Sequence, residues 1–306
     1  MIPLPWTTQP PDEFRGAAIA VGNFDGVHAG HRFLFKLLRK QADAIGGPAV
    51  VVTFEPHPLK LLRPSAFMPV LTPAADRVAL IQQCAIDRVW LLHTTEDLLR
   101  LSAQEFFEEV LQKRLQARAL VEGTSFHFGR DRAGDVRLLA ELCRDANIVL
   151  SVVPPFELAG RPVSSSRVRA ALESGDVRAA AQLLERPYRL RGTVARGAQR
   201  GRGLGFPTAN LVDTQSLVPA EGVYAVRVPL DEKTWPGAAN IGPNPTFGDL
   251  ARKVEVHLIG FDGDLLGQSL EMDFIERLRG VQTFASVNEL AEQIQRDVDA
   301  ARRLAQ

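Results

Sequence analysis

Two histidines three residues apart, His28 and His31, could serve chemistry in the stretch "VGNFDGVHAGHRFLF" (21–35). An apolar run before them predicts a strand, and periodic apolar residues after them predict a helix. Imidazoles at such a turn could bind a metal, move a proton or bind a phosphate. A zinc site needs a third ligand, and without an HExxH pattern the metal is the weakest of these hypotheses. A structural role, as a helix cap or in packing, stays open.

Three glycines around the pair favour the phosphate. Gly22, Gly26 and Gly30 would let backbone N–H groups approach an anion, and a helix beginning near residue 29 would add its dipole. Two imidazoles there could stabilise the charge that develops on a phosphate under attack, without a covalent step.

A second cluster, in "VSSSRVRAAL" (163–172), combines hydroxyls with two arginines at a predicted helix start. Arginines and N-terminal amides together can hold a triphosphate. An ordinary serine-rich cap followed by solvated arginines would give the same pattern, so both interpretations stay open. The residues concerned are Ser164, Ser165, Ser166, Arg167 and Arg169.

The second half of the chain carries hard oxygen ligands and one isolated carboxylate. The stretch "RGAQRGRGLGFPTANL" (196–211) lacks the GK[ST] of a Walker A loop, but its Thr208 and Asn210 suit Mg²⁺ bound to ATP. In "RKVEVHLIGFDGDLLG" (252–267), strand alternation sets Glu255 opposite the valines, where it could act as a general base. A hinge and a solvated glutamate are the structural alternatives.

The elements around the histidines predict an α/β domain. Residues 17–153 alternate short β-branched runs with stretches of helical period, as in a mostly parallel sheet covered on both faces. Strands are expected at 17–24 and 49–54, and a helix at 29–45. Ligands of such sheets bind beyond the carboxyl ends of the strands, where the histidine turn would lie. Ser102 and Glu105 have the spacing of a capping box.

Beyond this region glycines and prolines become dense, and short alternating runs predict an antiparallel barrel or sandwich. An amphipathic helix is expected at 286–304, opened by a capping box of Ser286 and Glu289. We therefore predict two domains, residues 1–186 and residues 187–306.

The composition bounds the class of protein. The 306 residues are 45% hydrophobic and 24% charged, which is typical of a soluble globular protein. Lys plus Arg and Asp plus Glu each total 36, so charge gives no argument for nucleic acid or a membrane surface as partner. Two cysteines, no leader-like start and no run of spanning length indicate a cytoplasmic protein. We expect a monomer or transient oligomer that acts on small molecules.

Several of these stretches resemble one enzyme family. "GNFDGVHAGH" resembles the extended HxGH signature of bacterial FAD synthetases, "TFEPHP" (53–58) resembles their adenosine-side loop, and "VSSSRVRAAL" resembles their ISSTRIR motif. The resemblance implies a Rossmann-like nucleotidylyltransferase domain. In it, His28 and His31 would stabilise the transition state, and Arg167 and Arg169 would hold the departing phosphates. Further binding residues implied are Gly22, Phe24, Asp25, Gly26, Gly30, Pro56, His57, Pro58, Ser125, Ser164, Ser165 and Ser166.

The second half resembles the riboflavin kinase module of the same family, through "GRGLGFPTANL", "GVYAVRV", "AANIGPNPTF" and "VEVHLIGFDGDLLGQ" in this order. The resemblance implies a small β-barrel that binds ATP around Gly205 and Pro207, with Mg²⁺ held by Thr208 and Asn210. Glu255 would take the proton of the ribityl hydroxyl.

Together the two resemblances imply a bifunctional transferase that phosphorylates riboflavin to FMN and adenylylates FMN to FAD, releasing pyrophosphate. Ser125 stands where the family usually has Asn or Asp, and Leu266 where it commonly has Tyr. Two alternatives stay open. One is a nucleotidylyltransferase of another specificity, and the other is a flavin-binding or regulatory protein that has lost one activity.

Overall fold

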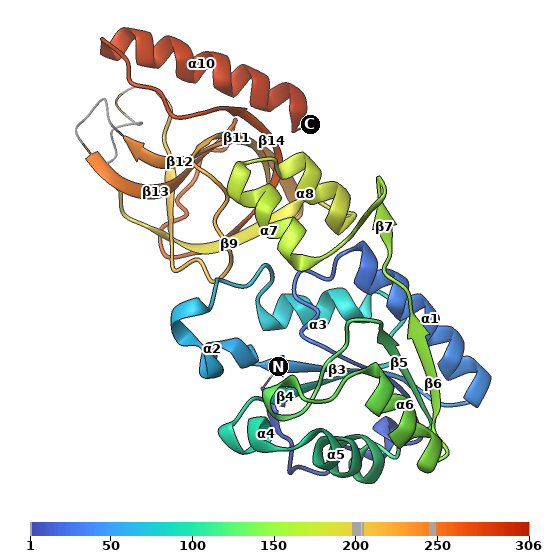
Figure 1. Cartoon of the computed structure of the whole chain (residues 1–306). Helices are drawn as coiled ribbons and strands as arrows, with labels where there is room; N and C mark the ends of the chain where they lie inside the picture. The colour runs from blue at the N-terminus through green and yellow to red at the C-terminus, as the bar shows by residue number, and fades with distance from the viewer. Residues whose placement is uncertain (1, 198–202, 204, 245–248, 306) are drawn as a thin grey trace. The chain divides into compact units, whose positions relative to one another are not determined.

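The computed structural model describes residues 2–197, 203, 205–244 and 249–305 (Figure 1). Its contacts divide the chain into two compact units. The first unit comprises Met1–Met68 and Pro73–Ser164, and the second comprises Pro69–Thr72 and Ser165–Gln306.

A six-stranded parallel sheet forms the centre of the first unit, in the order β1-β4-β3-β2-β5-β6. Small and β-branched apolar residues fill its central strands, as expected when both faces are covered. The predicted α/β sheet is confirmed. Its strands are β1 (Leu4–Pro5), β2 (Ala18–Val21), β3 (Ala49–Glu55), β4 (Arg88–His93), β5 (Ala119–Gly123) and β6 (Val149–Val153).

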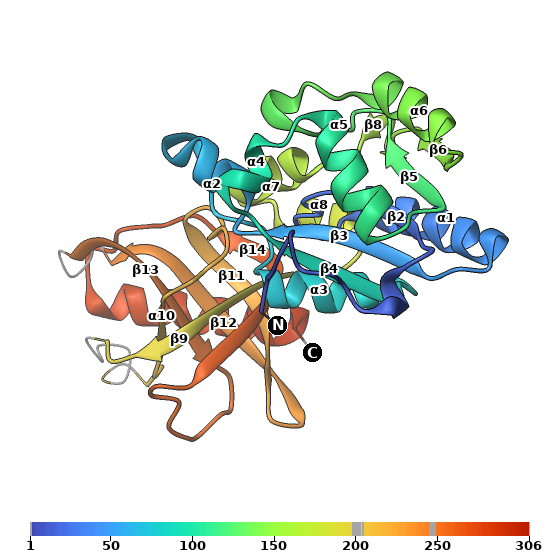
Figure 2. The ribbon, with the colours of Figure 1, turned by 90° about the horizontal axis from the view of Figure 1, so that it is seen from below.

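Successive residues of each strand pack against opposite layers of helices. Ala18 and Ala20 of β2 contact the layer of α1 and α3, whereas Ile19 and Val21 contact the layer of α4, α5, η3 and α6. Figures 1 and 2 show α3 and α5 on opposite sides of the sheet. The helices are α1 (Ala29–Ile45), α2 (Pro58–Leu62), α3 (Ala74–Gln82), α4 (Glu96–Arg100), α5 (Ala103–Phe106), the π-helical η3 (Phe107–Arg114) and α6 (Val136–Asp145).

Local signals in the sequence fix several of these elements. The helix predicted at 29–45 is α1, with the same bounds. Ser102 and Glu105 form the predicted capping box, because each side chain accepts the backbone N–H of the other residue, at 3.1 and 2.8 Å. Three short 3₁₀ turns and one small hairpin complete the unit. They are η1 (Asp12–Phe14), η2 (Pro64–Ala66), η4 (Arg130–Arg132), β7 (Glu157–Leu158) and β8 (Arg161–Pro162).

Six antiparallel strands of the second unit close into a barrel, in the order β10-β13-β12-β11-β14-β9, with β9 paired to β10. Inside, the rings of Tyr224 and Phe274 meet at 5.2 Å between centroids. The next residues, Ala225 and Ile275, contact the layer of α10 instead. The strands are β9 (Tyr188–Ala195), β10 (Ala209–Val212), β11 (Gly222–Leu230), β12 (Lys233–Asn244), β13 (Asp249–Leu258) and β14 (Ser269–Arg279).

Among the described residues, the helices of the barrel unit are α7 (Ser165–Ser174), α8 (Val177–Leu184) and α10 (Val287–Leu304). The Leu172 carbonyl of α7 accepts the Ala220 N–H at 2.9 Å, so α7 is tied to the chain that enters β11. The sequence analysis placed α7 and α8 in the first domain. The predicted domain boundary between residues 186 and 187 stays a prediction.

The C-terminal helix α10 is held against β14 by one ion pair with two hydrogen bonds. Arg279 donates through Nε and Nη2 to the Asp297 carboxylate, with the Nη2–Oδ2 distance at 2.8 Å. The predicted cap forms in part, because Ser286 accepts the Glu289 N–H at 3.2 Å, while the Glu289 carboxylate accepts the Ala285 N–H. None of the described helices combines the length and the apolar composition needed to cross a membrane.

Candidate active sites

Three of the sequence motifs converge at one edge of the first sheet. The turn of residues 22–28 follows β2, "PHP" (56–58) follows β3, and "TSFHFG" (124–129) follows β5. These strands are parallel, so their carboxyl ends meet at the same edge, which is where ligands of such sheets bind.

The turn after β2 is a strained and buried piece of backbone. Phe24, Gly26 and Val27 adopt left-handed conformations, with φ of 47°, 86° and 42°. Such a φ is unfavourable for Phe and most unfavourable for β-branched Val, and strain of this kind concentrates at functional sites. Burial of the Phe24 and Val27 side chains offsets the cost. The turn delivers His28 to the first position before α1.

The two histidines stack on each other at the N-terminus of α1. Their ring centroids lie 3.6 Å apart, and the planes differ by 19°. The backbone N–H of His31 donates to Nδ1 of the His28 ring at 3.4 Å. The ring proton of His28 is therefore assigned to Nε2. A Cβ on Gly30 would lie 3.2 Å from the His28 ring, so the glycine between the histidines makes this stacking possible.

His28 therefore offers its Nε2–H as a hydrogen-bond donor, and burial favours the neutral form of His31. Burial, and secondarily the neighbouring His28, lower the pKa of His31 well below its ordinary value of 6.5. Nδ1 of His31 is buried and has no hydrogen-bond partner among the described residues. Within the same residues, no group of three His, Cys, Asp or Glu side chains could hold a metal ion. The helix dipole and two N–H groups suit a phosphate at this position.

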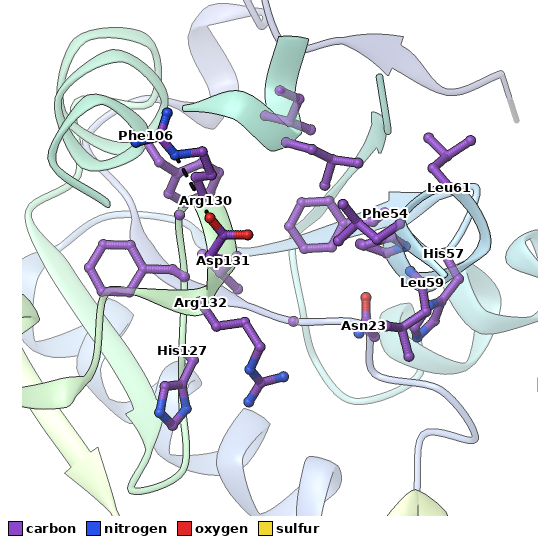
Figure 3. Close-up of a pocket in the computed structure, with 18 of the residues that line it drawn as sticks. Asn23, Phe54, His57, Leu59, Leu61, Phe106, His127, Arg130, Asp131 and Arg132 are labelled. Carbon is purple, nitrogen blue, oxygen red and sulfur yellow. Dashed lines mark hydrogen bonds and ion pairs between the residues drawn. The ribbon is translucent and has the colours of Figure 1, made fainter. Parts of the chain in front are cut away.

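A cavity of about 1000 Å³ opens beside this turn (Figure 3). Phe54, His57, Leu59 and Asn23 lie on one side of it, and Phe106, His127, Arg130 and Arg132 lie on the other. An apolar, aromatic interior with a few cationic groups suits a planar ligand that also carries a phosphate.

Three of the predicted loop residues, His57, Pro58 and Ser125, line this cavity, and Pro56 directly precedes them in the loop after β3. His57 caps α2, since its Nδ1 accepts the Leu59 N–H at 3.1 Å. Pro56 follows a cis peptide bond from Glu55, and the exposed Ser125 lines the cavity together with Pro58.

The serine and arginine cluster begins a helix, as predicted, but it falls in the other unit. The first unit ends at Ser164, and α7 begins with Ser165. The carbonyl of Val163, one residue earlier, lies 3.4 Å from where a Gly30 Cβ would be. How Arg167 and Arg169 stand to the histidine pair stays a prediction.

The barrel carries a row of polar residues across three neighbouring strands. Glu255 of β13 lies opposite Asn210 of β10 and opposite Asn240 of β12. Residues in such register have Cβ atoms about 5 Å apart. Val254 and Val256 are buried, so strand alternation turns Glu255 away from the barrel interior, as the sequence indicated.

The loop that enters β10 is fastened to β13. His257 Nδ1 lies 2.8 Å from the Pro207 carbonyl oxygen, and the His257 ring meets the edge of Phe206. Thr208, between this anchor and β10, is exposed, and Gly205 has a left-handed φ of 86°. Residues 198–202 and 204 of the predicted glycine-rich loop lie outside the described residues.

Close packing also fixes Asn210. A Cβ on Gly197 would overlap the Asn210 amide, so only glycine leaves room for that side chain. A cavity of about 500 Å³ beside Asn210 is lined by three cations, Arg196, Arg252 and Lys253.

Sequence reasoning missed three residues that shape these sites: Arg77, Glu122 and Asn240. Asn240 lies within "AANIGPNPTF", but only strand register places it beside Glu255. Glu122 is buried on β5 and accepts the Val21 N–H at 2.7 Å. A single carboxylate in the apolar strand "ALVEG" was the available signal for it.

Comparison with known proteins agrees with both halves. The FAD synthetase family model matches residues 11–167, and the riboflavin kinase model matches residues 184–305. A bifunctional riboflavin kinase/FMN adenylyltransferase of Pseudomonas fluorescens is 42% identical, covering 96% of this chain and 94% of the relative. The Escherichia coli K12 protein of the same name is 36% identical over the same shares.

A solved structure from Streptococcus pneumoniae, described as a macrolide-efflux protein, is 30% identical and superposes with a TM-score of 0.86. The superposition covers 98% of each chain, so that protein shares the whole fold.

The α/β unit with its HxGH turn and the closed barrel define a two-part nucleotide-dependent transferase. The chain belongs to the bifunctional FAD synthetase family, whose members join an FMN adenylyltransferase to a riboflavin kinase. The resemblance found in the sequence is confirmed at the level of the family.

Proposed function

We propose that this chain makes FAD from riboflavin through two ATP-dependent transfers, the first in the barrel and the second in the α/β unit. One observation carries the proposal. His28, which caps α1, stacks on His31 beside a large aromatic cavity, and the other half of the chain places the Glu255 carboxylate between two asparagines. The activities named for the relatives support the same pair of reactions.

In the barrel, Glu255 would take the proton of the riboflavin 5′-hydroxyl. The freed oxygen would attack the γ-phosphate of ATP, forming one P–O bond while the bond to ADP breaks. Asn210 and Asn240 flank Glu255 in register and would orient the hydroxyl and the phosphates. The cations Arg196, Arg252 and Lys253 beside Asn210 supply positive charge for those phosphates.

The same residues fit Mg²⁺ carried by ATP. Thr208 offers an exposed hydroxyl and Asn210 an amide oxygen, and both are hard ligands. Magnesium in such sites keeps several waters and binds the phosphates of its nucleotide as well as one or two protein groups. The ion would neutralise charge on the phosphates.

In the α/β unit, a phosphate oxygen of FMN would attack the α-phosphate of a second ATP. The bond between the α- and β-phosphates would break, and pyrophosphate would leave. His28 through Nε2–H and His31 through a ring N–H would donate to the α-phosphate oxygens as charge develops. Arg167 and Arg169 would hold the departing pyrophosphate, beside the hydroxyls of Ser164, Ser165 and Ser166.

The aromatic cavity would hold the isoalloxazine ring of FMN. Phe54 and Phe106 give it apolar walls, while Ser125 and Arg132 lie on its border as polar contacts. Gly22, Phe24, Asp25, Gly26 and Gly30 would shape the phosphate end, and Pro56, His57 and Pro58 the adenosine side.

We place the boundary between the two activities at residues 186 and 187 and the protein in the cytoplasm. It would act on free flavins and nucleotides, as a monomer or transient oligomer. The equal totals of acidic and basic residues support small-molecule substrates rather than a polyanionic partner.

The test is a time course with purified protein, riboflavin, excess ATP and Mg²⁺, separating riboflavin, FMN and FAD by chromatography. FMN should appear first and FAD later. FMN without FAD would contradict the α/β assignment and favour a protein that has lost one activity. No conversion would overturn the proposal, and pyrophosphate release with a sugar or other cofactor phosphate, but not with FMN, would favour a different nucleotidylyltransferase.

A further inference from the structure

A fully buried arginine lies behind the wall of the aromatic cavity. The Arg77 side chain, in the first turn of α3, is 1% exposed. Its Nη2 donates to the Phe54 carbonyl at 2.7 Å and to Glu55 Oε2 at 3.4 Å. Phe54 and Glu55 are the last two residues of β3, directly before the Pro56–Pro58 loop. The arginine therefore fixes the end of the strand that supplies one wall of the cavity.

The same guanidinium is electrostatically coupled to the histidine turn. Burial lowers the pKa of Arg77, and the carboxylates of Glu55 and then Asp25 act in the opposite direction. Asp25 is itself only 4% exposed and belongs to the turn that precedes His28. Arg77 thus pairs with Glu55 at the end of β3 and lies within electrostatic range of Asp25 in the histidine turn.

Stability alone does not account for the buried charge of Arg77. Desolvating a guanidinium is costly, and well-packed apolar residues often replace buried ion pairs without loss. Glu55 is 37% exposed at its side chain and gains little from a buried partner. The geometry is instead suited to holding two loops in one arrangement, because a planar fork can satisfy several acceptors at fixed angles.

We propose that Arg77 is a positioning residue for adenylyl transfer. It would hold the "GNFDGVH" turn and the "FEPHP" loop in one fixed arrangement relative to each other. The inference rests on the proposed function of the α/β unit. Arg77 touches no reacting atom; it acts through Asp25, Phe54 and Glu55.

The experiment compares Arg77→Met and Arg77→Lys with a matched control, Arg39→Met. Arg39 binds Asp87, which accepts the Ala49 N–H at the opposite end of the same strand. Each variant is assayed for FMN formation and, separately, for FAD formation from FMN and ATP. The kinase activity of the same chain reports that the protein is intact.

Arg77→Met should lower kcat/KM for FAD formation about tenfold or more, because small misplacements of reacting groups have effects of this size. Arg77→Lys keeps the charge but loses the fork, so it should fall between Arg77→Met and the wild type. Arg39→Met should stay within about twofold of the wild type, and FMN formation should be unchanged in all three variants.

A double variant separates positioning from a merely structural role. If Arg77 acts in part through Asp25, then Arg77→Met combined with Asp25→Asn should lose less activity than the product of the two single losses. Losses that multiply, full activity of Arg77→Met, or an equal loss in Arg39→Met would each overturn the inference. Should Arg77→Met not fold, wild-type kcat/KM in Arg77→Lys would overturn it instead. Absence of FAD synthesis in the wild type would reject the proposed function itself.

Discussion

The two units treat charge in opposite ways. In the α/β unit, several ionisable groups around the histidine turn are buried. His31 is uncharged at neutral pH, burial raises the pKa of Glu122 well above 4.5, and Arg77 is enclosed. On the barrel, charges stay on the outer surface and pair across strands, as where Arg189 binds Asp273 through two bonds of 2.6 and 2.7 Å.

The architectures explain this difference. A parallel sheet covered on both faces leaves only the loops at its carboxyl edge for function, so its site is assembled from buried loop residues. Every second residue of a barrel strand faces outward, so functional groups can be placed by register alone. The first site should therefore be sensitive to small displacements, and the second to the identity of single side chains.

The largest effects are expected when one residue of each site is replaced in separate variants. His28→Ala should lower FAD formation about 10²–10⁴-fold while FMN formation continues, and Glu255→Gln should do the reverse. Assays of each step with its own substrate would show this. Equal damage to both activities in a folded variant would mean that the two sites are not separate.

A single added methyl group tests the sensitivity to displacement. Gly30→Ala would press on the His28 ring, which lies 3.2 Å from the new Cβ, and should reduce FAD formation about tenfold. Gly197→Ala would collide with the Asn210 amide and should reduce FMN formation similarly. Gly123→Ala, with nothing within 4 Å of its Cβ, is the control and should leave both rates unchanged.

The buried carboxyl of Glu122 should appear in the pH dependence of stability. A pKa raised in the folded state means that its contribution is complete below pH 4.5 and is lost as pH rises towards the folded-state value. Across that window, Glu122→Gln should gain about 1.4 kcal/mol per pH unit relative to the wild type. Urea unfolding at several pH values would measure it, with Glu141→Gln at an exposed position of α6 as the control.

The smallest effect is expected at Ser125. This exposed side chain lies on the border of the aromatic cavity, and asparagine there would add an amide donor and a longer reach. Ser125→Asn should raise kcat/KM for FMN about threefold in FAD formation and leave FMN formation unchanged. A fall in that value would show that the loop already fits its ligand with serine.

What the sequence could predict follows the same division. The period-two alternation was enough to predict that Glu255 faces away from the barrel interior. The apolar periodicity was enough to predict the two ends of α1. The neutrality of His31 could not be predicted, because it depends on how deeply the folded chain buries the ring. Neither could Arg77, whose partner Glu55 lies 22 residues earlier in the chain and meets it only in the folded unit, nor Asn240, which lies opposite Glu255 through strand pairing.

Closure of the barrel also has a consequence for how the protein is made. The ring is completed by pairing β9 with β14, the first barrel strand with the last. On the ribosome, the sheet of the first unit is complete once residue 153 has emerged, whereas β9, which can pair with β10 earlier, lacks its second neighbour β14 until residues 269–279 follow. N-terminal domains generally fold first during synthesis, and an unpaired strand edge invites aggregation. A nascent chain halted before residue 269 should therefore have a folded α/β unit. Its barrel would still be open, with an unpaired strand edge that is prone to aggregation.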